Sequence, residues 1–189
     1  MCCGTKRLTE IRCPSDCVYL ASAREHPPAV AVRQQQRDVA LTVHFIRDFS
    51  QRQSELFLLV ADFLKRYEPA DFQSIVDDDV NAAASALAST FETASRGVIY
   101  DHRPASLPAE RLVAALKPLL QEAGKNGGTA FERDAAVVLR RVAEAVGDAR
   151  AADVGNRRAF LDLVGRVIRR GNQETADESD RNTPRLIVP

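Results

Sequence analysis

Apolar residues recur at steps of three and four positions along most of this chain, and this spacing constrains the fold more than any other feature. Such spacing puts one apolar stripe on one side of an α-helix, whereas a half-buried β-strand needs alternation at every second position. A first long segment runs from Pro28 to Tyr67 and carries the stripe Val39, Val43, Ile46, Ser50, Gln53, Phe57, Val60, Leu64 and Tyr67. Ser50 and Gln53 are polar, which leaves a break at this point as an alternative, but we expect one continuous helix.

The same spacing predicts four more helices along the chain. The first follows a cap at Asp71 and carries Phe72, Val76, Val80, Ala83, Leu87, Phe91, Ala94 and Val98. The second carries Leu112, Ala115, Leu116, Leu119 and Leu120 and closes at the stretch GKNGG. In the third, Thr129 and Glu132 form a T-x-x-E capping box ahead of Phe131, Ala135, Val138, Leu139, Val142 and Val146. The last extends from about Asp153 to Arg170, with Gly171 as its stop.

These elements predict an all-α fold, in which residues 28–171 form a bundle of about five helices with long N-terminal helices packed antiparallel. Residues 1–27 hold all the cysteines, and we expect a small cysteine-rich head there, with a short helix from Pro14 to Glu25. The stretch 172–189 is polar and acidic, with too little apolar surface to offset the entropy of ordering it. We therefore expect a disordered C-terminal tail.

Charge and hydropathy limit the surfaces that the chain can bind. Because it has 26 basic and 26 acidic residues, no net charge draws it onto nucleic acid or an anionic membrane. A membrane span needs about 18 uncharged apolar residues, and the best run, from Leu56 to Leu64, contains Asp62. Charges such as Lys6 and Arg12 stand where a signal peptide would be apolar. We expect a cytoplasmic protein with no membrane partner.

All the cysteines of the chain lie near its start, at Cys2, Cys3, Cys13 and Cys17. In a reducing cytoplasm, clustered cysteines are more often metal ligands or redox groups than disulfides. A helix that starts at Pro14 brings the sulfur atoms of Cys13 and Cys17 to one face near its N-terminus, where the helix dipole stabilises thiolate. We therefore predict a zinc site with these four ligands, and His26 as the substitute if only one of the two adjacent cysteines binds.

Two alternatives use the same cysteines. An iron-sulfur cluster or a thiol redox group also needs clustered thiols, but the spacing lacks the repeated C-x-x-C of ferredoxins, so zinc is preferred. In the other alternative, Cys13 and Cys17 are small buried apolar residues, and Cys2 and Cys3 belong to a frayed terminus.

Clusters that suggest an enzyme are incomplete. His44 and Asp48 are one helical turn apart, but an exposed pair of this kind is usually a weak surface contact. The run from Tyr100 to Arg103 gathers reactive side chains at a helix end, without a nucleophile or a phosphate loop. The three aspartates 77–79 lack the alternating ligands and central glycine of a calcium loop, so we expect a solvated helix face.

Nucleic-acid binding is the main alternative function. One basic set lies in and after the head and consists of Lys6, Arg7, Arg12, Arg24, Arg33 and Arg37. A second set consists of Arg157, Arg158, Arg166, Arg169 and Arg170. Both can contact phosphate, but neither is interleaved with aromatic residues. The function that we expect is that of a non-enzymatic, zinc-binding interaction or regulatory module with a protein partner.

Overall fold

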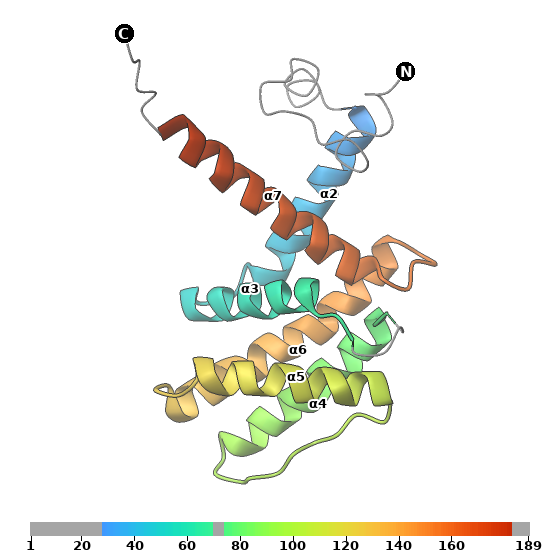
Figure 1. Cartoon of the computed structure of the whole chain (residues 1–189). Coiled ribbons are helices and arrows are strands. Elements are labelled where there is room, and N and C mark those ends of the chain that lie inside the picture. Colours follow the sequence, from blue (N-terminus) through green and yellow to red (C-terminus); the bar gives the residue numbers. More distant parts are fainter. Residues whose placement is uncertain (1–27, 70–73, 183–189) are drawn as a thin grey trace. The chain divides into compact units, whose positions relative to one another are not determined.

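The computed structural model describes residues 28–69 and 74–182, and for residues 172–182 it describes the backbone alone. All regular structure in these ranges is helical, which confirms the all-α prediction for this part of the chain (Figure 1). The helices are α2 (Ala29–Ile46), α3 (Gln51–Arg66), α4 (Asp77–Ala94), α5 (Leu107–Ala123), α6 (Gly128–Ala152) and α7 (Ala159–Asn182). The chain divides into two compact units, Met1–Ala40 and Leu41–Pro189, and the second holds α3 to α7.

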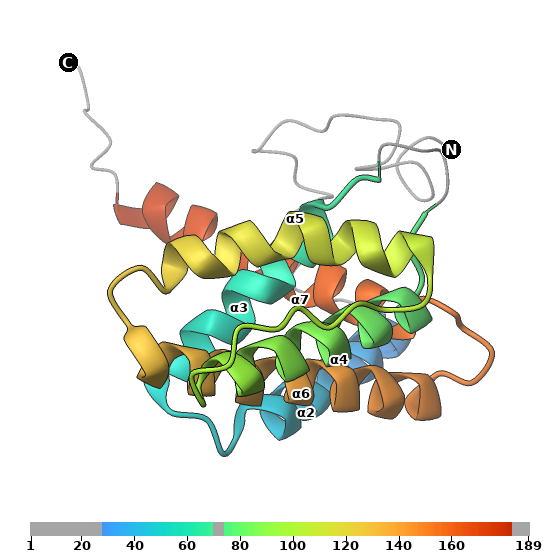
Figure 2. The same ribbon diagram turned by 90° about the horizontal axis from the view of Figure 1, so that it is seen from below.

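Helix α6 is the centre of the second unit. It packs most extensively against α4, and α3 and α7 also lie against it, while α5 covers α4 (Figure 2). Its apolar residues are buried on more than one face, with Ala135, Val138 and Leu139 at 0% exposure. A helix with apolar positions this broad must be covered by several neighbours. The core therefore lies around α6, and α3 packs on α6 and α7 rather than forming the predicted antiparallel pair of N-terminal helices.

The predicted continuity from Pro28 to Tyr67 is wrong, because the chain breaks between α2 and α3. Ser50 is the N-cap of α3: its Oγ accepts from the Gln53 backbone N–H at 3.3 Å, and Gln53 Oε1 accepts from the Ser50 N–H at 3.0 Å. This reciprocal capping box satisfies donors that a new helix leaves open. The two polar residues on the stripe thus start a helix. Before the break, Val43 of the stripe is 55% exposed, and neighbouring Phe45 is buried instead.

Helix α4 begins at Asp77, later than the predicted cap at Asp71, which lies outside the described residues. The Asp79 carboxylate accepts from the Val76 N–H at 3.1 Å and so caps the first turn. The predicted apolar stripe is confirmed along the helix, where Val80, Ala83, Leu87 and Phe91 are buried. Val98 lies beyond the helix and is 53% exposed, after Gly97 turns the backbone at a φ of 81°.

Three predicted boundaries around α6 and α7 differ from the structure. The Thr129–Glu132 capping box is absent, because α6 starts two residues earlier than predicted, with Gly127 at the N-cap and no side-chain cap. Helix α7 starts at Ala159 rather than Asp153 and continues through Gly171 to Asn182, into the predicted disordered tail. Gly171 does not have the positive φ of a C-cap glycine, and one glycine inside a helix costs only about 1 kcal/mol. Residues 183–189 lie outside the description.

Candidate functional site

The predicted zinc ligands Cys2, Cys3, Cys13 and Cys17, the substitute His26 and the basic residues Lys6, Arg7, Arg12 and Arg24 all lie outside the described residues. Within residues 28–69 and 74–182, no three His, Cys, Asp or Glu side chains are grouped so that they could hold a metal ion. None of the helices in these ranges is both long and apolar enough to cross a membrane.

The fold does not bring together the members of the two incomplete clusters, the pair His44 and Asp48 and the run from Tyr100 to Arg103. His44 Nε2 lies 3.6 Å from Asp148 on α6 rather than beside Asp48, which pairs with Arg47 at 3.1 Å. In the run from Tyr100 to Arg103, Asp101 binds Lys117 at 2.6 Å and Arg103 lies 3.9 Å from Glu110. The Tyr100 and His102 rings meet edge to face, with centroids 4.7 Å apart. These groups therefore face different partners and do not converge on one reacting atom.

The prediction that aspartates 77–79 form a solvated helix face is wrong for Asp77, which is buried at 0% exposure. Its carboxylate accepts from the backbone N–H groups of Phe160 at 2.9 Å and Leu161 at 3.2 Å, in the first turn of α7. Its own N–H donates to the Arg157 carbonyl at 2.9 Å. Burial raises the pKa of Asp77, and the two backbone hydrogen bonds oppose that rise. Asp77 thus joins the start of α4 to the start of α7.

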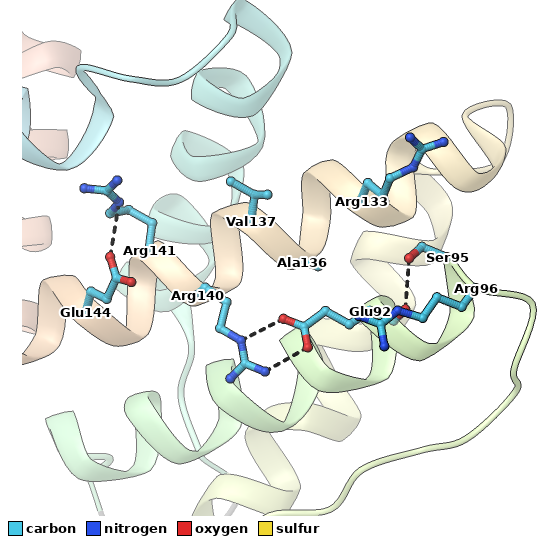
Figure 3. A pocket seen from close by; sticks show the side chains of 9 residues that line it. All are labelled: Glu92, Ser95, Arg96, Arg133, Ala136, Val137, Arg140, Arg141 and Glu144. Atoms are coloured by element: carbon cyan, nitrogen blue, oxygen red, sulfur yellow. Dashed lines mark hydrogen bonds and ion pairs between the residues drawn. The ribbon is translucent and has the colours of Figure 1, made fainter.

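A concavity with a volume of about 610 Å³ lies between α4 and α6; we call it the α4–α6 groove (Figure 3). The α4 side contributes Glu92, Ser95 and Arg96. The α6 side contributes Arg133, Arg140, Arg141 and Glu144 around an apolar floor of Ala136 and Val137. Val137 is 48% exposed, so this floor is open to solvent.

Two of the groove's arginines are paired with carboxylates. Arg140 grips Glu92 with two parallel bonds, from Nε at 2.9 Å and from a terminal nitrogen at 3.0 Å, and that nitrogen also donates to Ser89 Oγ. The Arg140 hydrogen bond lowers the pKa of Glu92, and the same bond raises the pKa of Arg140. Arg141 lies 3.4 Å from Glu144. The Arg140–Glu92 pair therefore joins α6 to α4 along one edge of the groove.

The other two arginines, Arg96 and Arg133, form no ion pair with any residue that the structure describes. Arg133 Nε donates only to the Thr129 carbonyl of its own helix, at 3.3 Å. The groove therefore combines an apolar floor with surplus positive charge at one end, a combination that suits a ligand carrying both a carboxylate or phosphate and an apolar group.

A second concavity of about 300 Å³ lies between α3 and α7; we call it the α3–α7 pocket. It is lined by Leu64, Lys65, Arg158, Leu161, Asp162, Gly165, Arg166 and Arg169. All three arginines belong to the second basic set identified from the sequence, and they lie close together in the chain, in the first half of α7 or just before it. Lys65 was missed, since only the packing of α3 on α7 places it beside residues so much later in the chain.

Comparison with protein-family models, with curated proteins and with solved structures found no match to this chain.

Proposed function

We propose that this chain is a non-enzymatic cytoplasmic interaction protein, in which residues 1–27 bind zinc and the helical body binds a protein partner. The observation that carries the proposal is the confinement of every cysteine to the segment from Cys2 to Cys17. Four thiolates make a complete ligand set for a structural zinc ion, and such an ion can order a segment that has no hydrophobic core of its own.

The donor set fits zinc better than it fits other metals. Thiolate sulfur is a soft ligand that binds zinc tetrahedrally, and hard cations such as magnesium and calcium prefer oxygen. The ligands in this proposal are Cys2, Cys3, Cys13 and Cys17, and His26 replaces whichever of the first two does not bind. Zinc would fix the shape of the segment and supply no redox chemistry.

For the helical body, we assign the partner to the α4–α6 groove and identify it as an acidic peptide segment with one apolar side chain. Charge complementarity supports this occupant, because Arg96 and Arg133 form no ion pair with the described residues. The exposed Val137 offers the apolar contact beside them. Bidentate binding of carboxylate by arginine gives such a contact both energy and orientation.

Metal analysis of the full chain after anaerobic purification tests the zinc proposal. We expect about one equivalent of zinc and no visible absorbance. Iron with visible absorbance bands would replace zinc with the iron-sulfur alternative. Less than about half an equivalent of any metal in folded protein would contradict a structural site, because such sites bind zinc tightly at neutral pH.

Binding of a synthetic glutamate-rich helical peptide with regularly spaced leucines tests the groove. Fluorescence anisotropy should show that Arg133→Glu weakens binding at least about tenfold, which corresponds to the loss of a charge-assisted contact and the gain of a repulsive one. Arg157→Glu is the matched control, since its side chain is exposed and does not line the groove. Equal losses in both variants would reduce the interaction to general charge attraction and overturn the assignment.

A further inference from the structure

The α3–α7 pocket is lined by more basic than acidic side chains. Its lining includes Lys65, Arg158, Arg166 and Arg169, against the single carboxylate of Asp162. Asp162 also accepts a hydrogen bond from the neutral amide of Asn156, from Nδ2 at 3.1 Å, and keeps its negative charge in the pocket. Lys65 and Arg169 form no ion pair within the described part of the chain.

The cations come from two helices and point to a site rather than to a stripe along one surface. Lys65 lies in the last turn of α3. Arg158 directly precedes α7, and its guanidinium donates to the Ile75 carbonyl, which ties the side chain to the segment before α4. Arg166 and Arg169 follow on α7, at positions that share a helix face with Asp162.

Burial distinguishes this set from ordinary surface charge. Lys65, Arg158 and Arg166 are only partly exposed, and Arg169 at the rim is exposed. Like charges that share a concavity and have lost part of their hydration repel one another, and an anion bound between them removes that repulsion. The net positive charge of the lining therefore favours a negative ligand.

The size and lining of the pocket select among negative ligands. A volume of about 300 Å³ suits a compact ligand. Its apolar lining is Leu64, Leu161 and Gly165, without an aromatic ring on which a nucleobase could stack. Three guanidinium groups match the oxygens of phosphate, which they bind in a bidentate way. A ligand with adjacent phosphoryl groups satisfies several cations at once.

We propose that the α3–α7 pocket binds a diphosphate or triphosphate group, either as free inorganic pyrophosphate or as the phosphate chain of a nucleotide. This goes beyond the zinc and partner proposals and does not depend on them, because no residue is shared between this pocket and either site. The phosphate chain provides the recognition in both sources, and the part of the molecule attached to it stays outside the pocket.

Gly165 offers a way to block the pocket without damaging the helix. A Cβ atom added to Gly165 meets no atom within 4 Å, and its φ is not positive. Gly165→Glu therefore puts a carboxylate into the basic pocket at a position that tolerates a side chain. Gly147→Glu is the matched control, because Gly147 is also a helical glycine with open space around it, on α6 away from the pocket.

Isothermal titration calorimetry of the full chain with pyrophosphate at low salt tests the proposal, with circular dichroism to verify that each variant is folded. We expect saturable binding of one pyrophosphate, weakened at least about tenfold by Gly165→Glu and changed less than about twofold by Gly147→Glu. A titration with ATP separates the sources: similar affinity indicates the free anion, and clearly tighter binding indicates a nucleotide.

Three results would overturn the proposal. The first is absence of pyrophosphate binding at millimolar concentration. The second is equal weakening by both glycine variants. The third is tighter binding of a single-stranded oligonucleotide that survives Gly165→Glu and falls steeply with salt, because this behaviour indicates an extended nucleic-acid surface instead of a compact site.

Discussion

Replacement of Asp77 by alanine should destabilise the helical body by about 3 kcal/mol. The substitution removes the acceptor of the Phe160 and Leu161 N–H groups, which the carboxylate binds at 2.9 and 3.2 Å. Loss of a helix cap costs about 0.5–2 kcal/mol, and each buried donor left without a partner costs about 1–3 kcal/mol. The total stays below the sum of these costs, because removal of a buried carboxylate also recovers its desolvation energy.

Urea unfolding followed by far-ultraviolet circular dichroism measures this effect. Asp78→Ala is the control, since Asp78 is the next residue and its ion pair with Arg150 is exposed, with side-chain exposures of 62% and 47%. Exposed pairs contribute at most about 1 kcal/mol, so the control should change the free energy of unfolding little. If Asp77→Ala costs no more than Asp78→Ala, the reasoning that Asp77 joins two helix starts is refuted.

The pH dependence of the same residue gives a second check. Burial raises the pKa of Asp77 above its ordinary 3.8, so the folded state holds this proton more tightly than the unfolded state does. The stabilising contribution of the group is then complete below the unfolded pKa and is lost as pH rises through the folded pKa. The free energy of unfolding of the wild type relative to Asp77→Asn should fall as pH rises from about 4. A rise over the same interval would contradict the assignment.

Other substitutions test the contacts around the groove, the break and the pocket. Glu92→Gln should lower the free energy of unfolding by about 1 kcal/mol at neutral pH. Because Arg140 lowers the pKa of Glu92, this difference between variant and wild type should vanish as pH falls through the lowered pKa. Urea unfolding at a series of acidic pH values measures it. Ser50→Ala should cost about 1 kcal/mol in urea unfolding, through loss of the α3 cap. Gly165→Ala should raise thermal stability by up to about 1 kcal/mol, whereas Gly97→Ala, at a φ of 81°, should lower it by a similar amount.

The apolar spacing predicted the helical interior well and its boundaries poorly. The buried residues Val80, Leu87, Leu116 and Leu139 all lie on predicted stripes, because burial of one helix face imposes its period on the sequence. Boundaries depend on caps, and a cap can come from elsewhere in the chain. Asp77 caps α7 rather than its own helix, so no local pattern around residue 159 could locate the start of α7.

For the candidate sites too, the sequence predicted what depends on neighbouring residues and missed what depends on the packing of distant helices. The three arginines of the α3–α7 pocket could be identified from the sequence, because Arg158, Arg166 and Arg169 lie close together in the chain and belong to one basic set. Lys65 comes from a distant helix, and the sequence has no signal that pairs α3 with α7. The α4–α6 groove was missed for this reason too, since Glu92 and Arg140 meet only through packing of their helices.

Limited proteolysis with and without a zinc chelator tests the central proposal most directly. Zinc binding by Cys2, Cys3, Cys13 and Cys17 should contribute on the order of 10 kcal/mol to the order of the head. The apolar stripes of the body contain no cysteine, so its stability does not depend on the metal. Chelation, or Cys13→Ser, should therefore expose residues 1 to about 25 to cleavage and leave the melting transition of the helical body almost unchanged. An N-terminal segment that stays equally protected in metal-free protein would contradict the zinc site.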